Sequence, residues 1–254
     1  MVASRESFAA LFKLVHVAYG FPTAHPHGMQ IMVHATDILG IDITDFSKLP
    51  IDRQLASVLV LTGRLREALE VLAIGAHRKL EDAVLGFAPS GDGFFVILHS
   101  EIAGYAPFLA LSLRTALLTP RHAPRPFIGC RFAVHYGEVT PFEDIMGRKN
   151  YVGPGINDTA RLLKARRHDS PNPELPTDEN SIVVSDAAYS AFRRRYPDVP
   201  EVRSFFDTIR YQEADWFSLC DKHETTHRAR FLEASRNVAI NFPLSVDITP
   251  GTTT

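Results

Sequence analysis

The stretch that decides the fold runs from Gly40 to Ser47 and reads GIDITDFS. It follows the apolar residues Ile38 and Leu39, and an apolar run that ends abruptly in an acid predicts a strand with Asp42 at its C-terminal end. Hydroxyl residues and then a long helical pattern follow. A carboxylate in this position is a common metal ligand beside a phosphate-binding turn, but an aspartate after a strand is also a common helix cap. Taken alone, this residue leaves both interpretations open.

The composition is that of an ordinary globular protein. Of the 254 residues, 45% are hydrophobic and 22% are charged, and the net charge is -2. This balance provides no global basic field for a nucleic-acid or membrane partner, and no apolar run reaches the roughly 18 residues of a membrane span. The N-terminus lacks the pattern of a signal peptide. We therefore expect a cytoplasmic protein in which Cys130 and Cys220 are reduced thiols, although one disulfide is possible.

Helical and strand patterns are mixed along the whole chain, with no internal repeat, which predicts one α/β or α+β domain. The predicted helices cover residues 6–19, 52–73, 101–118 with a kink or early break at Pro107, the end of 151–164, and 186–196. The predicted strands cover residues 31–43, in one piece or two, and then 84–87, 94–98, 127–139, 182–184 and two or three further segments before about residue 234. Polar loops are expected at residues 142–150 and 169–180.

A second acid, Asp92, lies in a Gly-flanked turn between two predicted strands, at the tip of a hairpin. Two carboxylates brought together can hold one or two divalent cations, which can bridge the oxygens of a triphosphate. The peptide N–H groups of residues 43–47 and the hydroxyls of Thr44 and Ser47 can contact phosphate oxygens. Because an aspartate in such a turn is also ordinary turn chemistry, Asp42 and Asp92 have a structural interpretation beside the metal-binding one.

Asn157 and Arg161 are four residues apart, which places them on one face of a predicted helix. An amide and a guanidinium presented together suit a ribose and the charge of a transferring phosphoryl group. The alternative is a solvated helix face.

Arg131 lies within an otherwise apolar strand, so its guanidinium must reach solvent or pair with an anion. A phosphate is one such anion, and Glu101 and Glu138 are alternatives. His135 in the same strand is interpreted as a hydrogen-bonded structural residue rather than as a ligand.

Four motifs occur in order along the chain. They are Asp-Ile-x-x-Phe-Ser at 42–47, Gly-Asp at 91–92, Arg-x-x-x-His-x-Gly-x-Val at 131–139, and Tyr-x-Gly followed by Asn-x-x-x-Arg-Leu at 151–162. Together they resemble the catalytic domain of the class III nucleotide cyclases, over roughly residues 35–232. The resemblance implies an α+β sandwich with the ferredoxin-like palm fold, which is a mixed, mostly antiparallel sheet with flanking helices.

The resemblance also implies a role for each matching residue in converting a nucleoside triphosphate to a 3′,5′-cyclic nucleotide and pyrophosphate. Two divalent cations, Mn²⁺ or Mg²⁺, would be bound by Asp42, Ile43 and Asp92. Asn157 would position the ribose, and Arg161 would stabilise charge on the α-phosphate. The implied phosphate-binding residues are Thr44, Phe46, Ser47, Arg131 and Lys222. Lys222 is a looser match to a hairpin lysine of the family, and a surface lysine is the alternative.

In that family the catalytic domains pair head to tail. The aspartates come from one subunit and the Asn/Arg helix from the other. The resemblance therefore implies a homodimer with two composite active sites and an inactive monomer. It also divides the chain into an N-terminal extension (1–34), a catalytic domain (35–234) and a C-terminal tail (235–254).

Two positions depart from the pattern by which purine cyclases read the base. The usual Lys or Glu is Ala88 here, and the usual Asp, Thr or Cys is Asn150. Alanine cannot read a purine edge, whereas Asn150 can donate and accept hydrogen bonds. A small cyclase domain with these substitutions resembles the pyrimidine cyclases of bacterial Pycsar anti-phage systems. These enzymes make cyclic UMP or cyclic CMP and act through a separate cyclic-nucleotide-binding effector. The alternatives are an adenylate or guanylate cyclase with atypical base contacts and a catalytically dead regulatory module.

Overall fold

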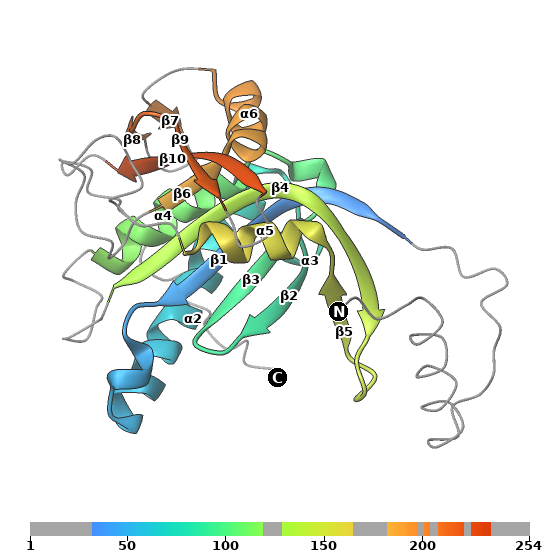
Figure 1. Ribbon diagram of the computed structural model, residues 1–254, viewed down its shortest axis with the longest axis vertical. Coiled ribbons are helices and arrows are strands. Elements are labelled where there is room, and N and C mark those ends of the chain that lie inside the picture. The colour runs from blue at the N-terminus through green and yellow to red at the C-terminus, as the bar shows by residue number, and fades with distance from the viewer. Residues whose placement is uncertain are drawn as a thin grey trace, which may run out of the picture. The chain divides into compact units, whose positions relative to one another are not determined.

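Strand β1 (His34–Ile43) is the strand on which the rest of the sheet is built (Figure 1). The computed structural model describes residues 32–118, 129–164, 182–197, 201–203, 208–220 and 225–234. Within it, β1 pairs antiparallel with β3 (Gly93–Leu98) on one side and with β4 (Cys130–Glu143) on the other. The strand predicted in this region is confirmed as one continuous segment of 10 residues.

The sheet continues outward from β1 in the order β2-β3-β1-β4-β6-β10-β8-β7, with β5 paired to β4 and β9 paired to β10. Among the pairs of described strands only β4 and β6 run parallel. The predicted α+β fold with a mixed, mostly antiparallel sheet is therefore confirmed. The remaining strands are β2 (Val84–Ser90), β5 (Lys149–Val152), β6 (Ile182–Ser185), β7 (Glu201–Arg203), β8 (Thr208–Glu213), β9 (Phe217–Cys220) and β10 (Thr226–Ala234).

Three helices cover one side of the sheet, which we call the helix face: α2 (Ile51–Gly75), α4 (Ala106–Leu118) and α6 (Asp186–Arg195). Successive side chains of a strand point to opposite faces, so alternate residues of β1, from Leu39 to Ile43, enter the core on this side. They pack against a stripe of four leucines on α2, each of which contributes about 1.5–3 kcal/mol when buried. The stripe consists of Leu61, Leu65, Leu69 and Leu72. The helix predicted at residues 52–73 is confirmed.

The other side of the sheet carries α5 (Pro154–Leu162), and we call it the α5 face. Figure 1 shows α5 lying across this face. Glycines permit the close approach. A Cβ atom on Gly40 would lie 2.9 Å from side-chain carbons of Thr159 and Leu163, and one on Gly155 would lie 3.0 Å from the carbonyl carbon of Gly137.

Two predicted boundaries are wrong. The helix predicted from residue 101 begins at Ala106, after a short 3-10 helix, η2 (Ser100–Ile102), and Pro107 occupies its first turn, where a missing N–H costs nothing. The loop predicted at 142–150 is shorter, because β4 continues to Glu143 and β5 begins at Lys149. Two further short helices are η1 (Phe46–Lys48) and α3 (Leu80–Ala83).

Several predictions lie outside the described residues. They concern the helix at 6–19, the loop at 169–180, Lys222, and most of the two terminal extensions. Cys130 is buried and forms no disulfide, as predicted, and burial raises its pKa. Among the described helices, none is both long enough and apolar enough to cross a membrane.

Candidate active site

Asp42 and Arg131 face each other across the β1–β4 ladder, because they are register partners. The guanidinium of Arg131 donates a hydrogen bond to Asp42 Oδ2, and both side chains are about one-fifth exposed, at 21% and 20%. The Nε atom of Arg131 is buried without a hydrogen-bond partner. The carboxylate beside this arginine is thus Asp42, and the predicted alternatives, Glu101 and Glu138, were wrong.

Asp92 joins this pair from the tip of the β2–β3 hairpin. Its neighbour Gly93 is the register partner of Asp42, and the carbonyl of Asp92 accepts the N–H of Ile43 at 3.4 Å. A Cβ atom on Gly93 would lie 1.8 Å from the carbonyl oxygen of Ile41, so only glycine allows the hairpin to lie this close. Burial and then the nearby Asp42 carboxylate raise the pKa of Asp92. The fold therefore brings Asp42, Asp92 and Arg131 together at one end of the sheet.

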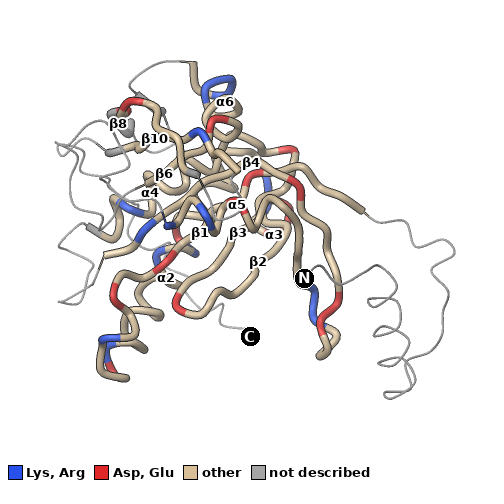
Figure 2. The backbone as a smooth tube through the Cα atoms, viewed as in Figure 1, with Lys and Arg blue, Asp and Glu red and all other residues tan. Residues whose placement is uncertain are grey.

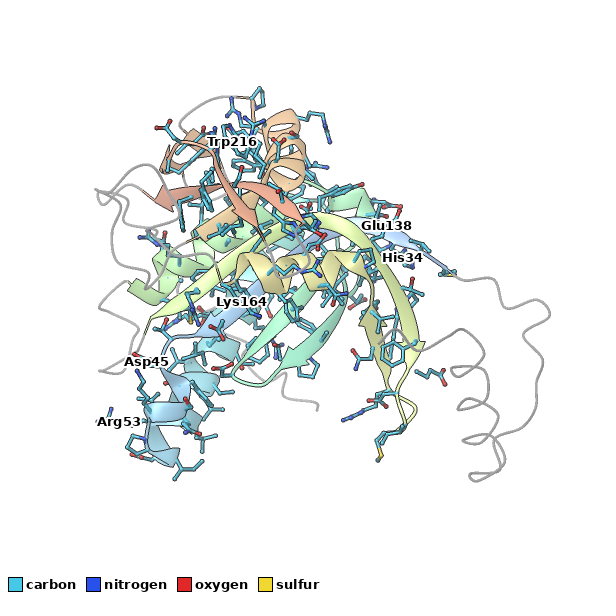
Figure 3. All side chains as sticks on the ribbon, in the orientation of Figure 1. His34, Asp45, Arg53, Glu138, Lys164 and Trp216 are labelled. Carbon is cyan, nitrogen blue, oxygen red and sulfur yellow. The ribbon has the colours of Figure 1, made fainter. Side chains whose placement is uncertain are left out.

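The turn after β1 supplies polar groups next to the two acids (Figure 3 labels its Asp45). The Thr44 N–H is already donated to the Gly129 carbonyl at 2.9 Å, but the Thr44 hydroxyl is buried without a partner. The side chain of Phe46 packs against the core, and Ser47 is exposed. Ile43 is 1% exposed on the helix face, so only its backbone carbonyl can serve a ligand.

The donor set at this end of the sheet fits a divalent cation that also binds a phosphorylated ligand. The carboxylates of Asp42 and Asp92 and the Ile43 carbonyl are the oxygen ligands that Mg²⁺ and Mn²⁺ take. Among the described residues, no group of three or more His, Cys, Asp and Glu side chains is arranged to hold a metal ion. A cation here would therefore complete its shell with water and with oxygens of its ligand, as Mg²⁺ commonly does.

Helix α5 presents the second predicted pair. It begins at Pro154, after Gly153 with φ 144°, and its inner side packs Ile156 and Ala160 against the sheet. Asn157 is exposed and Arg161 is partly exposed. The predicted site residues therefore form two sets. One set is around Asp42 at the end of the sheet, and the other is Asn157 and Arg161 on α5.

Arg161 forms an ion pair with Asp158, a residue outside the sequence motifs. Its Nη1 donates to Asp158 Oδ1, three residues earlier on the same helix. His135 Nε2 of β4 lies 3.7 Å from Asp158 Oδ2, and His227 Nε2 of β10 lies 4.0 Å from Asp158 Oδ1. His135 Nδ1 also lies 3.0 Å from Ser185 Oγ, so His135 is hydrogen-bonded, as predicted. Acidic and basic positions accordingly lie side by side around β1, β4 and α5 (Figure 2).

The two positions that depart from the purine-reading pattern lie on β2 and β5. Ala88 of β2 is 6% exposed and packs in one cluster with Tyr151, whose hydroxyl donates to the Leu85 carbonyl. Asn150 Oδ1 accepts the backbone N–H of Tyr151 at 2.8 Å. The amide nitrogen of Asn150 is the part of this side chain that remains to donate.

An apolar groove of about 630 Å³ lies between α2, α3 and β2. Leu65, Leu69 and Phe87 line it, and none of the predicted site residues does. It is therefore separate from the two sets of site residues.

The solved structures most like this chain include nucleotide cyclases. The catalytic core of a rhodopsin-guanylyl cyclase with converted specificity, in complex with ATPαS, has a TM-score of 0.54 and 17% identity, over 82% of this chain and 100% of that one. The guanylate cyclase domain of RhGC from Catenaria anguillulae, in complex with GTP, has a TM-score of 0.52 and 17% identity, over 81% and 100%. This chain has the fold of these catalytic domains.

A third structure, a bacterial light-regulated adenylyl cyclase, has a TM-score of 0.51 and 13% identity, over 94% of this chain and 64% of that one. Identities this low show the fold alone. No protein-family model and no curated protein matches the sequence.

Proposed function

We propose that this protein is a nucleotide cyclase that converts a nucleoside triphosphate to a 3′,5′-cyclic nucleotide and pyrophosphate. One observation carries the proposal. In the fold of a cyclase catalytic domain, three strands bring Asp42, Asp92 and Arg131 to one point, as the cyclase motifs require. A dead domain has no chemical reason to keep all of these charges together with Asn157 and Arg161.

The roles follow from the chemistry of each side chain. Asp42, Asp92 and the Ile43 carbonyl would hold two divalent cations, Mn²⁺ or Mg²⁺. When bound, these cations would make the ribose 3′-hydroxyl a better nucleophile and neutralise the phosphates. The donors of Arg131 and the hydroxyl of Thr44, with Ser47 and the backbone at Phe46, contact the outer phosphates.

In the reaction itself, the 3′-oxygen bonds to the α-phosphorus and its proton passes to solvent water. The bond from the α-phosphorus to the bridging oxygen breaks, and pyrophosphate leaves. Asn157 orients the ribose, and Arg161 stabilises the charge that grows on the α-phosphate. Lys222, outside the described residues, completes the phosphate contacts in this proposal.

We propose further that the site is shared between two copies of the chain. The two sets of contacts, around Asp42 and around Arg161, would then come from different subunits. Large apolar side chains are exposed on the β4–β5 hairpin, which supports a contact with a second copy. They are Phe142, Ile145, Met146 and Val152.

Complementation tests this arrangement. Asp42→Asn and Arg161→Ala should each be inactive alone. When the two variants are co-expressed, half of the dimers should be heterodimers, and each heterodimer has one intact site out of two. About a quarter of wild-type activity should therefore return. Activity that stays at the level of the single variants in a verified heterodimer contradicts a shared site.

The base is proposed to be a pyrimidine, with cyclic UMP favoured over cyclic CMP. Ala88 is short and packed in one cluster with Tyr151, so this position offers no long side chain to a purine edge. The amide nitrogen of Asn150 can donate to O4 of uracil, whereas cytosine presents an N4 donor there. We infer from the Pycsar resemblance that the product is a messenger in anti-phage defence, read by a separate effector.

The direct test incubates the purified protein with each of the four NTPs and Mn²⁺ and separates the products. Cyclic UMP is expected as the main product, with cyclic CMP second. Cyclic AMP or cyclic GMP as the main product would contradict the pyrimidine preference and keep the cyclase. No cyclic product from any of the four would overturn the cyclase and favour a regulatory module.

A further inference from the structure

The carboxylate of Asp158 is surrounded by groups from three elements of the α5 face. Arg161 reaches it from the same helix, His135 from β4 and His227 from β10. The sheet dictates this meeting, because β4 and β6 run parallel in a register that sets His135 beside Ser185, and Ala229 of β10 pairs with Ser185 on the other side. The side-chain exposures are 22% for Asp158, 15% for His135 and 11% for His227, so water screens these charges only partly.

Ordinary structural roles of a helical aspartate do not account for this position. Asp158 is the fifth residue of α5, beyond the first turn where an acid caps a helix or favours its dipole. An ion pair at a spacing of three on an exposed helix contributes only about 0.3–0.5 kcal/mol to stability. The same spacing occurs on α2 between Arg64 and Glu67. What distinguishes Asp158 is that it contacts Arg161, to which the proposed function assigns the α-phosphate.

His135 links Asp158 to the start of α6. Ser185 is the N-cap of α6, and its Oγ accepts the N–H of Ala188 at 3.2 Å. His135 Nδ1 lies 3.0 Å from the same Ser185 Oγ, which can both donate and accept hydrogen bonds. The other ring nitrogen, Nε2, faces Asp158 Oδ2 at 3.7 Å. A line of polar contacts thus runs from the start of α6, through β4, to Asp158 and Arg161.

We propose that Asp158 is a positioning residue that holds the Arg161 guanidinium in the direction in which it meets the α-phosphate, and that His135 holds Asp158 in turn. The inference rests on the proposed cyclase function. A guanidinium presents its N–H donors in a rigid planar fork, so the bond from Nη1 to Asp158 sets the direction of the whole group. Small misplacements of such a group are costly, because about 1 Å can reduce a rate roughly 100-fold.

The protonation of His135 reports whether this contact exists. The charged and titratable groups that face it are Asp158 from α5 and His227 from β10. Burial lowers the pKa of His135, the Asp158 carboxylate raises it, and His227 lowers it. Removing the charge at position 158 should therefore lower the pKa of His135 further.

The experiment compares Asp158→Asn and Asp158→Ala with a matched control, Glu67→Gln, which breaks the ion pair of the same spacing on α2. With the best NTP substrate, we expect kcat to fall about 10-fold in Asp158→Asn and further in Asp158→Ala, with KM within about threefold. Glu67→Gln should keep the wild-type kcat. In an Arg161→Lys background the effect of Asp158→Asn should largely disappear, since it acts through the arginine.

Histidine NMR titration provides the second measurement, which also shows that each variant is folded. The pKa of His135 should drop in Asp158→Asn and stay in Glu67→Gln. The inference is overturned by an unchanged kcat, by a kcat that rises because Asp158 had withheld the arginine, or by an unchanged pKa of His135. If the wild type forms no cyclic nucleotide from any NTP, the proposed function itself fails, and this inference fails with it.

Discussion

Asp37 and Asp42 lie five residues apart on β1, on opposite faces of one sheet. Asp37 is fully buried on the helix face, where its Oδ2 accepts the N–H groups of Gly104 at 2.7 Å and Ala106 at 3.1 Å. Asp42 is partly exposed on the α5 face, where its partner is Arg131 and its neighbour is a second acid, Asp92. One residue type on one strand thus ties a helix to the sheet on one side and forms a charged site on the other.

The difference lies in what covers each face. The helix face is closed by α2, α4 and α6, and the Asp37 carboxylate there accepts backbone N–H groups of the segment that begins α4. The α5 face carries α5 and the β4–β5 hairpin, which leaves the end of β1 accessible. Function on this sheet should therefore depend on the α5 face, and stability mainly on the helix face. Four substitutions test this separation, and two further substitutions serve as controls.

The largest effect is expected from Asp42→Asn. It keeps the shape of the side chain but removes the charge that a cation and Arg131 both need, so kcat should fall by on the order of 10²–10³-fold. The free energy of unfolding should change little, because Asp92 is relieved of a repelling neighbour while Arg131 loses its carboxylate. The measurements are cyclic-nucleotide formation and urea unfolding.

Asp45→Asn is the matched control for that variant. Asp45 lies in the turn three residues later, is exposed and has φ 55°, a conformation that asparagine tolerates. It should keep the wild-type rate. Equal losses of activity in the two variants would show that the turn, rather than the Asp42 carboxylate, matters.

Asp37 should make stability depend on pH in the opposite sense to most acids. Burial raises the pKa of Asp37 to about 6 from its usual 3.8. Between these values the folded state binds the proton more tightly, so stability is greatest below about pH 4 and falls as pH rises to about 6. The loss from this group is about 3 kcal/mol at about 1.4 kcal/mol per pKa unit. This loss should be absent in Asp37→Asn. The free energy of unfolding in urea, taken as wild type minus variant, should therefore fall by about 3 kcal/mol between pH 4 and pH 7.

Asp144→Asn serves as the control with the opposite sign. Backbone N–H groups of Arg148 and Met146 hold the pKa of Asp144 below its usual value. Its contribution is therefore present above the unfolded pKa and is lost as pH falls further. The prediction for Asp37 is contradicted if the free energies of unfolding of wild type and Asp37→Asn differ by the same amount at every pH. The Asp37 carboxylate would then be charged without an energetic cost on the helix face.

Much of the α5 face was predictable because the motif residues are close in sequence to the strands that carry them. Asp42 and Asp92 each follow a strong β pattern, and the hairpin between Val84 and Leu98 forms as expected. The pairing of Asp42 with Arg131 was not predictable, since it depends on the β1–β4 register between strands far apart in the chain. A shift of one residue would turn Arg131 toward the helix face.

Asp158 was missed for a related reason. Its spacing of three from Arg161 is visible in the sequence, but such pairs are common on solvated helices. Only the parallel pairing of β4 with β6 shows that His135 and His227 meet it. The start of α4 was misplaced because the apolar pattern continues through Ile102 and Ala103, whereas Pro107 and the Asp37 carboxylate determine where the helix begins.

A smaller effect is expected from Gly155→Ala, at the point where α5 meets β4. The new Cβ would lie 2.9 Å from the Glu138 carbonyl oxygen and 2.6 Å from a methyl carbon of Ile38. Backbone cannot yield easily, so α5 should shift, with a loss of about 1–3 kcal/mol in the free energy of unfolding. The rate should fall by more than stability accounts for, because the helix carries Asn157 and Arg161. A variant with wild-type rate and lower stability would show that the position of α5 is not critical.

The smallest effect is expected from Gly63→Ala, in the middle of α2. Nothing lies within 4 Å of a Cβ atom at this position, so the substitution adds no contact and removes backbone freedom from the unfolded chain. The free energy of unfolding should rise by about 0.5–1 kcal/mol with no change in rate. Gly155 and Gly63 are both glycines within helices. If the free energy of unfolding falls in Gly155→Ala and rises in Gly63→Ala, the opposite effects come from the surroundings of each glycine. A loss of activity in Gly63→Ala would instead mean that the outer side of α2 takes part in catalysis, for example through the second copy.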